Sequence, residues 1–405
     1  MPFFARIKAR FASPRGRRVS LWLSFFFFWG AIGSFIPYLS LYYDSIGLTG
    51  THIGILNSVR AALSFMSAIA IAFLSDVLRR RRLVFILLII GMIIMLAIFP
   101  HMASFITILP IVALYSALQT PNIAILDQET LSMLANPRDY SVVRVGGSFG
   151  VGIITFLTGL IVDWPGVPLS IIFYIHIALL VMLLFLLLTL PESHDQKKQA
   201  KIPSFKDVAL LFRLPGFALW MVIIFLFGFG DAALINFLFL HIRAIGGSAS
   251  LMGLATVFSI AGEIAGYYLA QRIQKRVGSR RMIVLAFIFR TLWFILIALN
   301  RIPLLVLPIH ILNGIGFALI GAGSVAYVNE RAPQHIGTTA QGIRSAILIR
   351  LSAVVGSLFA GAIYQRAGSA SMYLIFAAIS AVSLLLAALL RRADRRREAN
   401  SSNAI

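Results

Sequence analysis

Residues 168–190, PLSIIFYIHIALLVMLLFLLLTL, decide the fold class of this chain because they hold no Asp, Glu, Lys or Arg. A helix rises about 1.5 Å per residue, so about 20 apolar residues cover the ~30 Å hydrocarbon core of a bilayer. A helix also satisfies its own backbone hydrogen bonds, which the interior of a bilayer requires. We therefore expect residues 168–190 to form a transmembrane helix.

Apolar runs of similar length recur along the whole chain. Hydrophobic residues make up 60% of the sequence and charged residues 12%, whereas a soluble domain is about 25% charged. Polar turns, several with Pro or Gly, separate the runs. The predicted spans are 19–43, 52–77, 83–100, 104–133, 141–164, 168–190, 216–244, 249–275, 281–299, 303–330, 338–366 and 370–391. The sequence therefore predicts an all-α polytopic membrane protein with twelve transmembrane helices.

The basic residues indicate which ends of these spans face the cytoplasm. The chain has 35 Lys and Arg against 14 Asp and Glu, a net charge of +21. Most of the basic residues fall in the two termini and in alternate loops, while the opposite loops hold only Arg243, Arg301 and Arg366. The positive-inside rule then predicts that both termini are cytoplasmic. We attribute the basic clusters to this topology and to contact with anionic lipids, and we expect no nucleic-acid partner.

An internal repeat divides the spans into two halves. Residues 46–49 (IGLT) align with 245–248 (IGGS) at an offset of 245 − 46 = 199, and the same offset places the arginines at 81–82 on those at 280–281. Six spans separate the copies, so both halves have the same orientation, a known transporter arrangement. We expect two pseudo-symmetric six-helix bundles at 1–191 and 216–405, the second with a basic cytoplasmic tail. A cytoplasmic linker at 192–215 joins them.

Twelve spans, cytoplasmic termini and a long central loop resemble the major facilitator superfamily. The signature loop of that superfamily, Gly-x-x-x-Asp-Arg-x-Gly-Arg-Arg, is present in degraded form as AFLSDVL at 72–78 followed by four arginines at 79–82. The resemblance implies that Asp76, Arg79 and Arg80 hold a cytoplasmic gate. It also implies a monomer in the bacterial inner membrane.

A narrower resemblance is to the lactose permease and phenylpropionate permease branch. It rests on Asp127, Tyr140, the pattern Arg144-x-x-Gly-Ser-x-Gly, Glu263, Arg290 and the GIGF segment at 314–317. In that branch an acid of span four, the Arg opening span five and a Glu of span eight surround the substrate. The resemblance therefore implies substrate contacts for Asp127, which lies one residue out of register, Arg144 and Glu263.

The same branch couples transport to protons through an Arg in span nine and a ladder of basic residue, His and Glu in span ten. Arg290 and His310 match these positions, but Leu307 and Asn313 replace the basic residue and the Glu. An amide cannot titrate, so proton coupling requires another acid. The acids available inside the spans are Glu263 and Asp231.

Charged residues inside the predicted spans are candidate functional residues because each costs at least ~2.5–3.5 kcal/mol near the bilayer centre. They are Arg60, Asp231, Glu263, Arg290 and Arg350. Arg60 shares a helix face with polar residues at 57, 64 and 67, and Glu263 shares one with residues 256, 259 and 267. We expect both stripes to line a wet cavity. The alternative is that the charges only pair with one another to lock helices together.

Uncharged polar residues complete the predicted substrate site. Gln119 and Asn122 flank Pro121 in span four, and Asn236 lies in span seven. The aromatic residues Trp29, Tyr38, Tyr42 and Trp293 could stack on a sugar or an aromatic acid, although packing or interfacial anchoring would also explain them.

These features predict a secondary transporter that moves a sugar, a nucleoside or an aromatic or organic acid by proton symport. One alternative is a drug or metabolite exporter of the same fold, and another is a solute sensor without transport. The absence of Pro from the fifth span counts against the exporter. No phosphate-binding loop, His-Glu-x-x-His or Gly-x-Ser-x-Gly pattern occurs, so we expect no ATPase or other enzymatic activity. The chain has no Cys, and we expect no metal or cofactor.

Overall fold

The computed structural model describes residues 13–78, 81–134, 136, 139–189, 211–212, 216–332 and 337–402. All regular secondary structure in these ranges is helical, and ten of the described stretches are long and apolar enough to cross a membrane. The predicted all-α polytopic class is thus confirmed, whereas the number of twelve spans stays a prediction. The chain divides into two compact units. The first comprises 1–199 and 248–254, and the second comprises 200–247 and 255–405.

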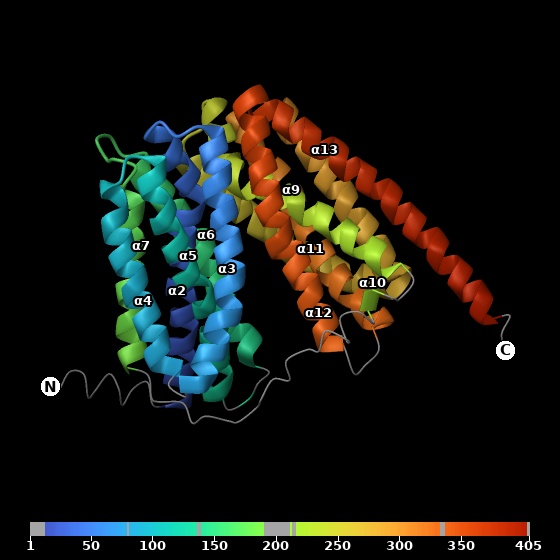
Figure 1. Cartoon of the computed structure of the whole chain (residues 1–405), viewed down its shortest axis with the longest axis horizontal. Helices are drawn as coiled ribbons and strands as arrows, with labels where there is room; N and C mark the ends of the chain where they lie inside the picture. The colour runs from blue at the N-terminus through green and yellow to red at the C-terminus, as the bar shows by residue number, and fades with distance from the viewer. Residues whose placement is uncertain are drawn as a thin grey trace. The chain divides into compact units, whose positions relative to one another are not determined.

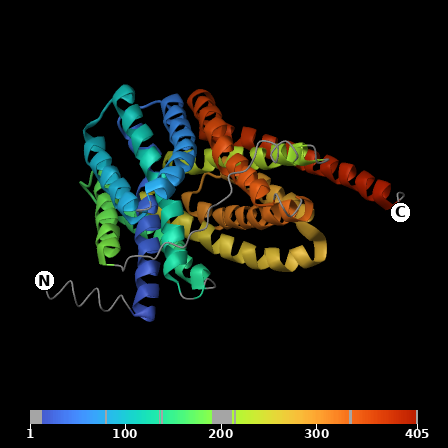
Figure 2. The same cartoon turned by 60° about the horizontal axis from the view of Figure 1, so that its bottom comes forward.

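The first unit is a bundle in which neighbouring helices run side by side (Figures 1 and 2). α2 packs on α6 and α7, and α5 packs on α3 and α4. Ser13 caps α2 by accepting a hydrogen bond from the Gly16 N–H, and Ser104 caps α5 in the same way through Thr107. The helices are α2 (Pro14–Ser45), α3 (Gly50–Leu78), α4 (Arg81–Ile98), α5 (Phe105–Met133), α6 (Tyr140–Val162) and α7 (Ile171–Thr189), with a 3-10 turn η1 (Phe99–His101).

Glycines set the distance between α2 and α6. A Cβ at Gly150 would clash with the backbone oxygen of Phe26, and one at Gly33 would lie 2.6 Å from the Thr155 hydroxyl. Gly33 of α2 and Gly150 of α6 therefore bring the two helix backbones together. Such contacts between small residues are typical of helices packed in a membrane.

The second unit contains α9 (Phe217–Ala244), α10 (Ala249–Leu299) from residue 255 onward, η3 (Pro303–Leu305), α11 (Val306–Arg331), α12 (Gly337–Ser345), a π-helix η5 (Ala346–Leu351) and α13 (Ser352–Ser402). α13 packs on α9. Two long helices are interrupted by glycines with left-handed φ angles, α10 at Gly278 (φ 79°) and α13 at Gly368 (φ 75°). Glycine carries no Cβ and adopts this conformation at little cost. The apolar core of the unit includes Trp220, Phe227 and Phe287.

The π-helix interrupts the span predicted at 338–366 without ending it. α9 approaches it closely, because a Cβ at Gly228 would clash with the Leu348 oxygen and the Ser352 hydroxyl. Ser352 donates its hydroxyl hydrogen to the Leu348 oxygen, which satisfies a carbonyl displaced by the wider turn. π-Helical turns occur frequently at functional sites, and this one contains Arg350.

The predicted gate lies mostly outside the described residues. Asp76 is near the C-terminal end of α3, whereas Arg79 and Arg80 lie outside the described residues. The linker predicted at 192–215 also lies outside them, except for residues 211–212. The gating role of these residues stays a prediction.

Candidate functional site

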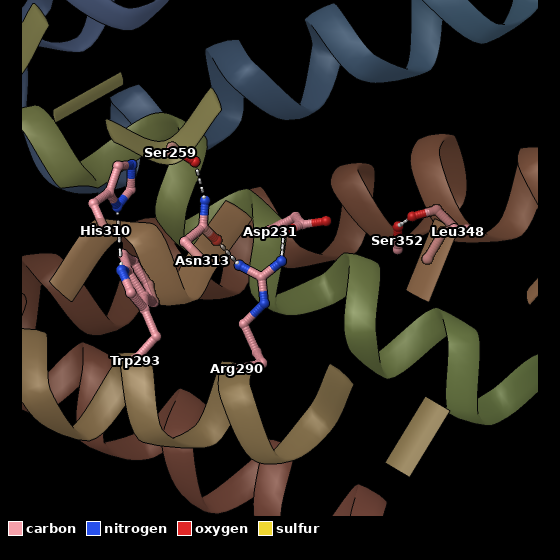
Figure 3. Close-up of polar contacts among 8 residues, drawn as sticks. All are labelled: Asp231, Ser259, Arg290, Trp293, His310, Asn313, Leu348 and Ser352. Atoms are coloured by element: carbon pink, nitrogen blue, oxygen red, sulfur yellow. Dashed lines mark hydrogen bonds and ion pairs between the residues drawn. The ribbon is translucent and has the colours of Figure 1, made fainter. Parts of the chain in front are cut away.

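A fully buried arginine is the centre of a polar network in the second unit (Figure 3). Arg290 of α10 is 1% exposed, and its guanidinium forms an ion pair with Asp231 of α9. The same guanidinium donates to Asn313 Oδ1 of α11 at 2.7 Å and lies 4.4 Å from the ring centre of Phe227. α9 thus supplies an anion and an aromatic face, and α11 supplies an amide oxygen, to one buried cation on α10. These contacts offset the cost of removing the charge from water.

Asn313 extends this network to a fourth helical segment. Its Nδ2 group donates to the Ser259 hydroxyl at 3.0 Å while its Oδ1 accepts from Arg290. An amide can donate and accept at once, whereas an ionised carboxylate only accepts. Asn313 therefore links Arg290 to Ser259 where the sequence lacks the expected Glu. The carboxylate beside Arg290 comes instead from Asp231.

His310 lies next to this network and has its own partner. The Trp293 indole N–H donates to His310 Nδ1 at 3.1 Å, and both side chains are buried. A neutral histidine that accepts at Nδ1 carries its proton on Nε2. The proton-coupling role of His310 stays a prediction.

Glu263 of α10 and Arg350 of η5 differ from Arg290 because neither has an ion pair or side-chain hydrogen bond within the described part of the chain. Both are half-buried. α11 packs tightly beside Glu263, since a Cβ at Gly314 would lie 2.5 Å from the Glu263 backbone nitrogen. An ionisable group in a span that lacks a partner among its neighbours is a candidate for contact with a solute or ion.

The first unit brings together two of the predicted substrate residues. Asp127 of α5 accepts a hydrogen bond from the Tyr140 hydroxyl at 2.8 Å, and Arg144 of α6 pairs with the same oxygen at 3.2 Å. The Arg144 and Asp127 side chains are 45% and 30% exposed. The Arg144 guanidinium lies 5.9 Å from the ring centre of Trp29 on α2. The acid, the base, a phenol and an indole therefore form one partly open cluster.

Four other predicted substrate residues lie within one unit or the other, and three of them have hydrogen-bond partners there. Arg60 donates from Nε to Asn57 Oδ1 at 3.2 Å. Asn236 donates to the Ser357 hydroxyl at 2.9 Å. Gln119 is buried in α5, and Asn122 there donates to the Leu118 oxygen and the Met92 sulfur. The binding roles of these four residues stay predictions.

Two polar contacts of the first unit were not predicted from the sequence. The Tyr115 hydroxyl and His176 Nε2 lie 3.1 Å apart, and both side chains are buried. The histidine in the otherwise apolar run 168–190 could have indicated a buried polar partner, because a buried imidazole needs a hydrogen bond. The second contact involves Asp163, which follows α6 outside the candidate span Tyr140–Val162.

Asp163 binds the start of α10, which belongs to the first unit. Its two carboxylate oxygens accept the backbone N–H groups of Ala249 and Ser250, each at 2.8 Å. Burial alone would raise the pKa of the Asp163 carboxyl, but hydrogen bonds from Ser250 and Ala249 outweigh it and lower the pKa below its usual value. A carboxylate at a helix N-terminus also interacts favourably with the helix dipole.

Replacing Asp163 with Asn is expected to destabilise the protein by about 1 kcal/mol at neutral pH, because the amide loses one of the two acceptor oxygens and the charge that interacts with the helix dipole. Because the folded-state pKa is lowered, this contribution is present above the usual Asp pKa and is lost as the pH falls through the folded value. Thermal unfolding of both proteins in detergent at pH 7 and below about pH 4 measures it. An equal difference at both pH values would contradict the role of the charge.

The sequence of this chain is similar to a known protein family and to two bacterial transporters. Residues 19–375 match the MFS_1 like family. The chain is 24% identical over 380 residues to the maltose permease of Geobacillus stearothermophilus, covering 92% of this chain and 94% of the relative. It is also 24% identical over 358 residues to the probable 3-phenylpropionic acid transporter of Escherichia coli (strain K12), covering 85% and 91%.

Solved structures with low sequence identity share the fold. The nucleoside transporter NupG superposes with a TM-score of 0.83 at 17% identity, covering 92% of this chain and 98% of that one. An inward-facing, occupied bacterial homologue of the lysosomal transporter Spinster gives 0.73 at 14% identity, covering 94% and 98%. The helices, the intramembrane charges and the matched family agree, and the chain belongs to the MFS_1 like family of major facilitator membrane transporters.

Proposed function

We propose that this protein moves a small organic solute across the membrane by alternating access and couples that movement to protons. The observation that carries the proposal is the contrast between two kinds of charge in the second unit. Arg290 is neutralised by Asp231, whereas Glu263 and Arg350 lack such partners among the described residues. A charge kept in a span without a protein partner costs stability, and binding a solute or a proton accounts for its presence.

Glu263 is the proposed proton acceptor. Protonation of Asp231 would remove the counter-ion of a fully buried guanidinium. Protonation of Glu263 breaks no ion pair formed by the described residues, so it is compatible with a folded, empty transporter. Asp231, Arg290 and His310 are the other proposed proton-coupling residues, and we propose that their interactions change when Glu263 takes up a proton.

The proposed substrate is a sugar, a nucleoside or an aromatic or organic acid. Proteins similar to this chain are named for maltose, 3-phenylpropionic acid and nucleosides. The open cluster of Asp127 and Arg144 offers acceptors and donors for hydroxyl, carbonyl or carboxylate groups. The remaining proposed substrate contacts are Glu263, Arg350, Arg60, Gln119, Asn122 and Asn236.

We propose that the protein is a monomer with twelve spans in two halves. Both termini would face the cytoplasm, with the protein in the inner membrane of a bacterium. α3 is 29 residues long and supplies one span beyond the ten candidates. The candidate stretch Ala340–Ala387 is 48 residues long, enough for two crossings, and the interruption at Gly368 provides the turn between them.

Uptake into proteoliposomes tests the function. The purified protein is reconstituted, and radiolabelled maltose, uridine and 3-phenylpropionate are offered with and without an inward proton gradient. We expect gradient-dependent accumulation of one of the three and its loss when a protonophore is added. Binding without flux would support a sensor, and accumulation driven only by an outward solute or proton gradient would support an exporter.

A further inference from the structure

We propose that Trp29 is the stacking surface of the substrate site, so that the transported solute carries a ring whose flat face lies on this indole. The inference rests on the proposed transport function and makes its substrate class narrower. It follows from the position of Trp29 in the Asp127–Arg144 cluster of the first unit.

α6 holds the polar part of this site on one helix face. Tyr140, Arg144 and Gly147 are spaced i, i+4 and i+7, so they project from the same side of the helix. Asp127 of α5 fixes the first two by accepting from the Tyr140 hydroxyl and pairing with Arg144. This face of α6 therefore presents the phenol of Tyr140 and the guanidinium of Arg144. One turn later it carries Gly147, which has no side chain.

Trp29 occupies the space that this glycine leaves. A Cβ at Gly147 would lie 2.7 Å from Cδ1 of Trp29 and 3.1 Å from its Cγ, so the indole packs directly on the α6 backbone. Phe28, the preceding residue of α2, forms a T-shaped contact with the indole, with ring centroids 6.1 Å apart. The indole thus has packing partners on both α2 and α6, although the residue is only half-buried.

A fixed indole beside an anchored guanidinium matches a ring with a polar substituent. Aromatic groups stack on indole, and the flat apolar face of a sugar ring can do the same. The Arg144–Asp127 pair is partly exposed, and such pairs contribute little stability. A hydroxyl, carbonyl or carboxylate of the solute can therefore take over part of their hydrogen bonding while the ring remains on Trp29.

Trp22 provides a matched control on the same helix. It packs on Gly146, the neighbour of Gly147, with a Cβ there lying 3.0 Å from its ring, and it stacks on Phe26 with centroids 5.5 Å apart. Trp22 lines a surface pocket with Arg18 and Val142. Loss of either indole removes a ring that packs on a glycine of α6, and Trp29 differs in that it also lies beside the Arg144 guanidinium.

The experiment compares Trp29→Leu, Trp29→Phe and Trp22→Leu in the full-length reconstituted protein with maltose, uridine and 3-phenylpropionate. We expect Trp29→Leu to raise KM about tenfold or more, in line with the effect of removing an aromatic stacking partner. Trp29→Phe should restore most of the affinity, and Trp22→Leu should leave KM within about twofold. Gly147→Ala, which displaces the indole, should raise KM in the same direction as Trp29→Leu.

Intrinsic fluorescence gives a second readout that does not require transport. The chain has five tryptophans, and we expect the ligand-induced change to disappear in Trp29→Phe and to persist in Trp22→Phe. The solute that produces the change distinguishes an aromatic ring from a saccharide ring. A fluorescence change without flux would support the site and overturn the transport function. Flux with equal KM values for Trp29→Leu and Trp22→Leu would overturn the stacking role alone, and the absence of both signals would overturn both proposals.

Discussion

Replacing Glu263 with Gln is expected to abolish proton-driven accumulation of substrate while leaving exchange of substrate across the membrane at least partly intact. Glutamine has nearly the same shape as glutamate but cannot take up a proton. Within the described residues Glu263 forms no ion pair, so the substitution leaves no unpaired cation and the fold should persist. Only the step that requires proton binding is then lost.

The size of the effect follows from the driving force. A gradient of one pH unit stores about 1.4 kcal/mol per proton, enough to hold a neutral solute at about tenfold excess when one proton accompanies it. For Glu263→Gln we expect this ratio to fall to about one in proteoliposomes, whereas counterflow continues.

Glu330 gives the control for this experiment. This carboxylate near the end of α11 accepts a hydrogen bond from Ser279 at 2.6 Å and lies outside the polar network of Arg290. We expect Glu330→Gln to accumulate substrate as the unmodified protein does. Undiminished accumulation by Glu263→Gln would exclude Glu263 as the proton acceptor.

Replacing Asp231 with Asn is expected to destabilise the protein by about 3–5 kcal/mol, the cost of leaving a buried ion without its partner. The Arg290 side chain is 1% exposed, while that of Asp231 is 20% exposed. Removing the anion therefore strands a charge that water cannot reach. Removing the cation through Arg290→Met strands one that water reaches in part, so this variant should lose less stability.

A double-mutant cycle measures this coupling. Asp231→Asn combined with Arg290→Met removes both charges, and we expect the double variant to unfold at a higher temperature in detergent than Asp231→Asn alone. A double variant as unstable as the sum of the two single changes would show that the ion pair contributes no coupling energy.

The sequence predicted the helical membrane class because long apolar runs leave few other folds. The family resemblance also assigned Asp127 of span four and Arg144 of span five to one site, and the structure brings these two side chains together. It identified position 313 as an amide where an acid was expected. These are features carried by composition, length and local motif.

Other features depend on how distant helices pack. Asp231 and Arg290 lie on different helices, and only their packing angle and depth decide that the two charges meet. The π-helix has no sequence signal of its own. It is a single turn in which the backbone hydrogen bonds span five residues where an α-helix spans four. The binding of Asp163 to the N–H groups of residues 249 and 250 requires a loop and a helix start that are far apart in the sequence to come together.

The Arg290–Asp231 pair also determines how the protein responds to voltage. A pair of opposite charges fixed on packed helices has no net charge, so the membrane potential exerts no net force on it as the protein changes conformation. A single charge that crosses the field gains or loses about 2.3 kcal/mol per 100 mV. In the proposed mechanism the electrical work of a transport cycle therefore falls on the charges outside this pair, on the proton and on the solute, and the summed charge of proton and solute sets whether the cycle is electrogenic.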